Sequence, residues 1–249
     1  MNTGFYFKRG FKCLKKNFLK WVIFLMIVFS GCASKNDELY EAVLNQNMER
    51  VKSLIQAGAD VNGAVYRGSS ILHEAVTTGS LEIVKWLVKY GASLEGKNRY
   101  GLTPLLWGVY NGKTKGILPV LDFLIQSGSD LNAENKRGCN ALALAVEENE
   151  REVVEFLLDQ KMDVNAAGSG CEGKSPLSIA AYWGYQEIVR LLVERKADVN
   201  AKDRQGKSVL DWAKTEVTAK NQREMLYLSK ETSQKEKIAE FLMLHGAKK

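Results

Sequence analysis

Histidine and cysteine are scarce in this 249-residue chain, and their scarcity argues against a metal or catalytic centre. Two histidines are too few for a metal cage, and none of the four cysteines has the close pairing of a zinc site. The sequence also lacks a nucleophile elbow and a phosphate-binding glycine loop. Because no acid, base or nucleophile converges, we expect a non-enzymatic protein that uses no metal and no cofactor.

Acidic residues are absent from the segment before Cys32, which instead holds all of the basic excess. Removing its six basic residues from the 35 Lys and Arg leaves 29, which equals the number of Asp and Glu. The rest of the chain is therefore formally neutral and has no electrostatic footprint for a phosphate backbone. We expect no nucleic-acid partner. The six basic residues are Lys8, Arg9, Lys12, Lys15, Lys16 and Lys20.

The apolar run near the N-terminus, residues 21–29, is too short to cross a membrane. As a helix it would extend ~14 Å, against a hydrocarbon core of ~30 Å. Basic residues precede the run, and small and polar residues follow it at positions 30–34. This layout predicts a cleaved signal peptide with a short signal helix over residues 1–31.

The residues Phe29-Ser30-Gly31-Cys32 resemble the bacterial lipobox, although the lipobox usually has an aliphatic residue in place of Phe29. The resemblance implies that Cys32 is diacylated, becomes the mature N-terminus and is N-acylated, with residues 32–35 as a short linker. Acyl chains contribute about 0.8 kcal/mol per buried methylene, so they would hold the protein to a bilayer. The implied location is a bacterial cell membrane, facing the periplasm or exterior, and the outer membrane where one exists. An ordinary signal peptide, or an uncleaved signal anchor with an incidental cysteine, is the alternative.

One short phrase occurs five times between residues 60 and 200. Asp60-Val61-Asn62 returns in steps of 33, 37, 33 and 35 residues, at 93–95, 130–132, 163–165 and 198–200. A second phrase keeps the same spacing and begins each time with glycine, at positions 68, 101, 138, 173 and 206. A period in the thirties indicates stacked two-helix units, each burying its apolar face against its neighbours.

Within the second phrase, Thr103-Pro104-Leu105 and Ser175-Pro176-Leu177 resemble the ankyrin-repeat family. The hydroxyl caps a helix, and proline fits the first helical position. The resemblance implies an all-α ankyrin-repeat solenoid of stacked helix-turn-helix units with hairpin fingers. We expect the repeat domain to be monomeric. We expect about six repeats over residues 36–249: an N-terminal cap at 36–65, then 66–98, 99–135, 136–170 and 171–203, and a C-terminal cap at 204–249 with an insertion at about 217–233.

Single residues in the repeats carry two further expectations. Other repeats have a glycine, such as Gly58 or Gly91, at the position where the second helix ends in a left-handed conformation. Lys161 and Lys196 occupy the same position in their own repeats. If the geometry is kept, each lysine costs ~1 kcal/mol of backbone strain. His73 stands fourth in the Thr-Pro-Leu-His phrase of the family, which implies that it hydrogen-bonds to backbone and steadies a finger.

Ankyrin-type proteins bind partners through the finger tips and the exposed face of the first helices, and tyrosine, tryptophan and arginine are common interface anchors. The resemblance therefore implies a protein partner. The same aromatic residues could instead fill gaps between repeats, and we expect that packing role for Trp107 and Trp212. The predicted protein-binding residues are Tyr66, Arg67, Arg99, Tyr100, Leu102, Tyr110, Arg137, Tyr182, Trp183 and Arg204.

Cys139 and Cys171 fall on adjacent predicted fingers, 32 residues apart. A disulfide between them is possible if the Cα atoms come within about 7 Å, and two free thiols are the alternative. The glycine-rich stretch around Cys171, residues 168–173, is expected to be a flexible hairpin.

Together these patterns predict a non-enzymatic ankyrin-repeat lipoprotein that mediates protein–protein interaction at the bacterial cell envelope. Its partners would be a protein of unknown identity and, through the acyl chains on Cys32, a membrane. Two alternatives remain open: a structural scaffold or stabiliser of an envelope enzyme complex, and a secreted ankyrin-type effector or immunity factor.

Overall fold

The computed structural model describes residues 34–63, 68–111, 113, 115–215 and 222–248, with backbone alone over 222–232. The expected signal peptide and Cys32 lie outside these residues. None of the helices in the described part is both long and apolar enough to cross a membrane.

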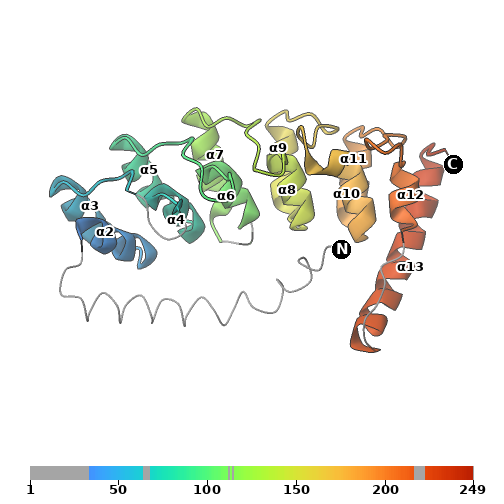
Figure 1. Ribbon diagram of the computed structural model, residues 1–249, viewed down its shortest axis with the longest axis horizontal. Coiled ribbons are helices and arrows are strands. Elements are labelled where there is room, and N and C mark those ends of the chain that lie inside the picture. The colour runs from blue at the N-terminus through green and yellow to red at the C-terminus, as the bar shows by residue number, and fades with distance from the viewer. Residues whose placement is uncertain (1–33, 64–67, 112, 114, 216–221, 249) are drawn as a thin grey trace.

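Helices arranged in successive pairs make up the described part of the chain, and Figure 1 shows the pairs side by side in one elongated row. The first helix of a pair is short, and the second begins within a few residues of its end, except in the last pair. The pairs are α2 (Lys35–Leu44) and α3 (Met48–Gln56), α4 (Ile71–Thr78) and α5 (Leu81–Lys89), α6 (Pro104–Tyr110) and α7 (Ile117–Gln126), α8 (Ala141–Glu147) and α9 (Arg151–Asp159), α10 (Pro176–Trp183) and α11 (Gln186–Glu194), and α12 (Val209–Ala213) and α13 (Gln222–Leu244).

Two layers of helices form the row. The first helices contact one another in order from α2 through α4, α6, α8 and α10 to α12, and second helices such as α3 and α5 pack beside them. No strand occurs among the described residues, although Lys202 and Ser208 form an isolated antiparallel bridge. The predicted all-α solenoid is therefore confirmed, and each unit is stabilised mainly by its neighbours.

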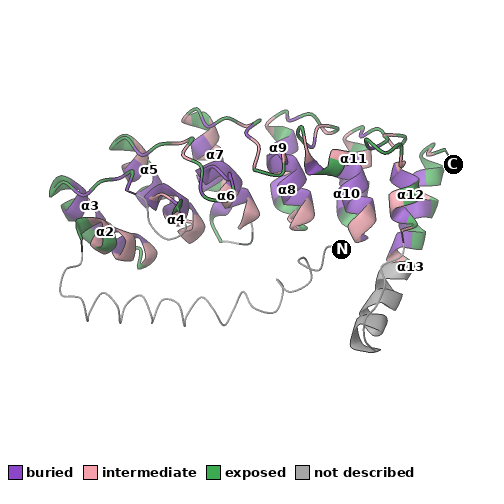
Figure 2. Ribbon diagram, in the orientation of Figure 1, coloured by how far each residue is buried: buried purple, intermediate pink, exposed green. Residues whose placement is uncertain are grey.

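The core runs along the row between the two layers (Figure 2). Second helices bury one apolar face: α11 buries Ile188, Val189, Leu191 and Leu192. The first helices lie between two neighbours, so α8 buries every residue from Ala141 to Val146. The small alanine side chains of α8 let the neighbouring helices pack closely on both of its sides. The helix therefore has no polar face before Glu147.

The recurring Asp-Val-Asn phrase links each repeat to the next. Asp163 Oδ1 accepts a hydrogen bond from the backbone N–H of Asn165 at 2.9 Å, which closes a tight turn. Asn165 Oδ1 then accepts from the N–H of Asp198 in the next repeat, at 2.8 Å. Asn62 makes the equivalent bond to the N–H of Ser93, also at 2.8 Å. The phrase thus has a structural role, because it satisfies backbone N–H groups of the loops that link the repeats.

The helix ends follow the sequence in detail. Thr103, Asn140 and Ser175 each accept a hydrogen bond from the N–H group three residues on, as N-caps. Lys161 and Lys196 have φ of 64° and 69°, so the predicted left-handed lysines are confirmed.

Candidate functional site

Three of the fingers that join one repeat to the next share one hairpin geometry. In the first, the N–H of Asn98 donates to the carbonyl of Leu102 at 3.0 Å, and Asn98 Oδ1 accepts from the N–H groups of Tyr100 and Leu102. Asn135 and Asp203 make the same set of bonds in their own fingers. Each tip closes with a glycine at positive φ: Gly101, Gly138 and Gly206. The shared geometry presents the two residues after each Asn or Asp at the tip.

Cationic residues stand at these tips, as the sequence predicted for Arg99, Arg137 and Arg204. The Arg99 guanidinium lies 4.6 Å from the ring centre of Tyr100 and donates to its hydroxyl. Arg204 donates to the backbone carbonyl of Ser169 on the preceding loop. Arg137 differs, because it donates twice to Glu147, at 3.0 and 2.7 Å. The hydrogen bond to Glu147 is the main cause of a raised pKa for Arg137.

Three of the predicted aromatic residues, Tyr110, Tyr182 and Trp183, lie at the ends of the first helices and are half-buried. Tyr110 stacks on Trp107 with ring centres 5.7 Å apart. Tyr182 lies at the end of α10, where its ring meets those of Trp183 at 5.0 Å and Trp212 at 5.3 Å, edge to face in both cases. These rings are therefore partly packed and partly accessible to solvent. Tyr100, on its finger, is more exposed, with 39% of its surface accessible.

Leu102 does not belong to this surface, and its prediction as a binding residue is wrong. Only 5% of it is exposed, and it lies in the continuous core. The chain re-enters the stack directly after Gly101, so the side chain of Leu102 turns inward. Its carbonyl oxygen is 2.9 Å from Nε2 of His73, which confirms the expected backbone hydrogen bond of that histidine.

Tyr66 and Arg67 lie outside the described residues, as does Cys32, so their predicted roles stay predictions. Trp107 packs against the core as expected. Trp212 is fixed by a hydrogen bond from Nε1 to Oδ2 of Asp203 at 3.1 Å, which also fits a packing role.

Cys139 and Cys171 form a disulfide, with Cα atoms 4.8 Å apart. The bond joins one finger to the glycine-rich stretch, which also donates backbone hydrogen bonds from Gly170 to Gly138 (2.8 Å) and from Cys171 to Arg137 (3.0 Å). A 3-10 turn, η2 (Cys171–Gly173), follows with Cys171 and Glu172 at positive φ. Residues 168–173, which we expected to form a flexible hairpin, are thus held to the preceding finger by the disulfide and these hydrogen bonds.

Among the described residues, one group of three possible metal ligands comes within 4.8 Å: Cys139, Cys171 and Glu147. Its two sulfur atoms are bonded to each other, and Glu147 is engaged by Arg137. No thiolate is available there, so the disulfide form does not fit a metal ion.

A cluster of lysines and aromatic rings, which the sequence analysis did not predict, lies at the C-terminal end of the row. The ammonium groups of Lys207 and Lys174 lie 3.5 and 4.1 Å from the ring centre of Trp212. Lys235 of α13 lies 5.0 Å from the ring centre of Tyr182 and donates to the carbonyl of Thr215 at 3.0 Å. Cation–π contacts of this kind stabilise partly desolvated lysines. They tie α13 to the α10–α12 end of the row.

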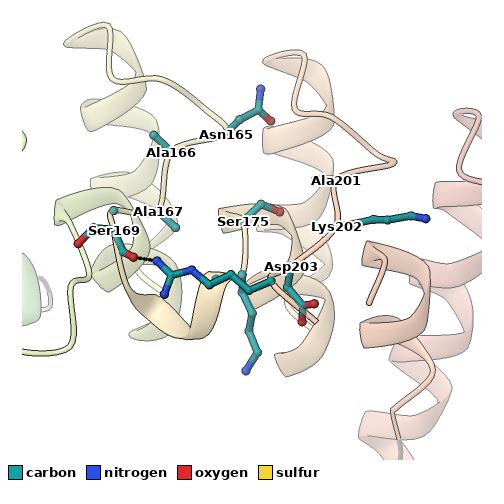
Figure 3. A pocket seen from close by; sticks show the side chains of 12 residues that line it. Asn165, Ala166, Ala167, Ser169, Ser175, Ala201, Lys202 and Asp203 are labelled. Carbon is teal, nitrogen blue, oxygen red and sulfur yellow. Dashed lines mark hydrogen bonds between the residues drawn. The ribbon is translucent and has the colours of Figure 1, made fainter. Parts of the chain in front are cut away.

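A groove of about 460 Å³ lies between the loops 165–175 and 201–204 on the finger side (Figure 3). Lys202 and Arg204 contribute cations without an ion pair to its lining, Lys174 pairs with Glu172 at 2.6 Å, and Ser169 and Ser175 contribute polar groups. Asp203 is the one acid in the lining, and its carboxylate already accepts from Gln205, Lys207 and Trp212. The groove is therefore electropositive.

Comparison with known proteins places this arrangement in a family. The model of the family described as "Ankyrin repeats (3 copies)" matches residues 39–134 and 113–203, and the chain belongs to the ankyrin-repeat family. Ankyrin repeats mediate protein–protein interaction, and proteins built from them are generally non-enzymatic scaffolds.

One similar solved structure is the ankyrin repeat domain of Bcl-3, described as a unique member of the IkappaB protein family. It is 29% identical, with a TM-score of 0.66, and the match covers 85% of this chain and 86% of that one. A comparison with curated proteins found no match.

Proposed function

We propose that this protein is an ankyrin-repeat lipoprotein, anchored through acyl chains on Cys32, that binds a protein partner at the bacterial cell envelope. The observation that carries the binding proposal is the surface shared by the finger tips and the ends of the first helices. Exposed Arg99 and Tyr100 lie there with half-buried Tyr110, Tyr182 and Trp183. Aromatic rings that are already partly packed lose little conformational entropy when a partner covers the rest of them.

The envelope location is supported by two features of the chain. The lipobox-like residues end at Cys32, directly before a domain that begins at α2 with the Ser34 cap. The disulfide between Cys139 and Cys171 favours an oxidising compartment, because cytosolic reductants keep most thiols reduced. Export followed by acylation accounts for both.

The binding proposal is tested by replacing two rings at once. Tyr110→Ala with Trp183→Ala should abolish capture of the partner from solubilised envelopes while changing the thermal midpoint little. A control pair on the second-helix layer, Phe123→Ala with Phe156→Ala, removes similar half-buried area and should leave capture intact. A large fall in stability with capture unchanged would assign Tyr110 and Trp183 to packing.

The anchor is tested by mass spectrometry of the mature N-terminus from a membrane fraction. We expect the wild type to begin at an acylated Cys32 and the Cys32→Ala variant to lack the lipid. An unmodified Met1 in the wild type would overturn the lipoprotein assignment and leave the binding proposal standing.

A further inference from the structure

Basic side chains on the finger edge lack acidic partners. We define the finger edge as Lys97, Arg99, Lys136, Lys202 and Arg204, all of them exposed. Within the described part of the chain, none of the five forms an ion pair. Their hydrogen bonds go to neutral groups: Lys97 to the carbonyl of Glu134 at 3.3 Å, Arg99 to Tyr100, and Arg204 to the carbonyl of Ser169. Their positive charge is therefore uncompensated.

Several cations elsewhere on the repeat domain form ion pairs, whereas Lys85, Lys89 and Arg190 on the second helices contact aromatic rings. On the second helices, Arg151 pairs with Glu155 at 3.4 Å, and Arg195 pairs with Asp159 at 2.8 Å. Near the N-terminal cap, Arg50 pairs with Glu38. Because the finger-edge cations form no ion pair among the described residues, an acidic segment of a partner would complement their charge.

The fingers also fix the spacing of these cations. Neighbouring fingers are joined by hydrogen bonds, such as Lys136 N–H to the carbonyl of Tyr100 at 3.2 Å. Each finger is a hairpin two chains wide, and paired chains lie ~4.8 Å apart, so equivalent tips recur about every 10 Å. An extended polyproline II segment makes one turn in three residues, rising ~3.1 Å per residue. Such a segment would present every third side chain to the edge at nearly the same spacing.

We propose that the finger edge binds an extended, acidic segment of the protein partner, with a carboxylate at about every third residue. The electropositive groove beside Lys202 and Arg204 takes one of these carboxylates (Figure 3). The inference rests on the protein-binding role proposed above and names the chemistry of the partner. The finger between those of Lys136 and Arg204 carries Glu172, which pairs with Lys174 at 2.6 Å, so the row of unpaired cations has one neutral position. Spaced charges of this kind suit a peptide better than the denser phosphates of nucleic acid.

The test uses the full-length chain in a non-ionic detergent and a fluorescein-labelled peptide of four Glu-Pro-Pro triplets. We expect saturable binding that weakens as salt rises, and none for the Gln-Pro-Pro peptide. The Arg99→Glu, Lys136→Glu, Arg204→Glu triple variant should weaken binding by about tenfold or more, since three exposed charge contacts are each worth up to ~1 kcal/mol. The matched control, Lys85→Glu with Lys89→Glu and Arg190→Glu on the second helices, should bind like the wild type.

Any of four results would overturn the inference. One is equal loss of peptide binding in the finger-edge and control variants. Another is that a peptide with its four glutamates in one block binds as tightly as the Glu-Pro-Pro peptide, which would show that the spacing of the carboxylates does not matter. The third is binding to phosphatidylglycerol vesicles or single-stranded DNA without binding to the peptide. If partner capture needs Tyr110 and Trp183 but is unchanged in the finger-edge triple variant, the inference of an acidic partner is wrong and the proposed function still stands.

Discussion

His73 is held in one neutral form by its surroundings. Its Nε2 lies 2.9 Å from the Leu102 carbonyl and its Nδ1 lies 3.1 Å from the N–H of Ser70, which assigns the proton to Nε2. Burial lowers the pKa of His73, and the hydrogen bond to Leu102 offsets only part of that effect. A proton on Nδ1 would face the Ser70 N–H, so protonation opposes the native finger.

The stability of the protein should therefore fall as pH drops. Because the folded pKa of His73 is depressed, its contribution is complete above the unfolded value of ~6.5 and is lost as pH falls toward the folded value. Urea unfolding at pH 7.5, 6.5 and 5.5 would measure this slope. The His73→Gln variant should lose the His73 part of the slope, and His245→Gln should keep it. Identical slopes in all three proteins would contradict the assignment.

Two lysines carry backbone strain that a single substitution relieves. Lys161 and Lys196 are exposed and left-handed, so Lys161→Gly and Lys196→Gly should each raise the free energy of unfolding by roughly 0.5–1 kcal/mol, after allowing for the greater freedom of unfolded glycine. Chemical denaturation would measure the gain. Lys85→Gly, at an exposed interior position of α5, should instead destabilise by about 1 kcal/mol. Destabilisation at Lys161 or Lys196 would show that their side chains matter more than the strain.

At the scale of elements, the periodic features of the sequence were predictable and the long-range ones were not. The repeat phrases predicted the helix pairs and caps because these features depend on neighbouring residues. Leu102 was misassigned because its direction depends on the path of the chain after Gly101. The Lys174, Lys207 and Lys235 cluster was missed because it needs α13 to return to α10 across an insertion, and no local pattern encodes that path.

The disulfide is the element that most constrains a finger. It closes a loop with a sequence separation of 32, so its loss should lower the free energy of unfolding by about 2–4 kcal/mol. Denaturation with and without dithiothreitol would measure the effect. The Cys139→Ala, Cys171→Ala variant should be less stable than the oxidised wild type and should not respond to the reductant. A wild type indifferent to reduction would indicate that the bond adds nothing to the stack.

At the scale of the molecule, formal neutrality conceals a division of charge. The balance of 29 basic and 29 acidic residues after the N-terminal segment predicted no electrostatic footprint. The fold places cations without an ion pair along the finger edge and pairs Arg151 and Arg195 of the second helices with acids, which no composition can reveal. Arg137 shows the limit of prediction for single residues, because the sequence did not indicate its pairing with Glu147 and its predicted binding role stays a prediction.

The most direct measurement of the binding face is site-specific photo-crosslinking in intact membranes. A benzoylphenylalanine replaces Tyr110 or Trp183 on the proposed face, or Lys85 or Phe156 on the second-helix layer. We predict one discrete crosslinked protein from the first two positions and none from the other two. Crosslinks that arise equally from both layers, or from Lys85 and Phe156 alone, would contradict the account.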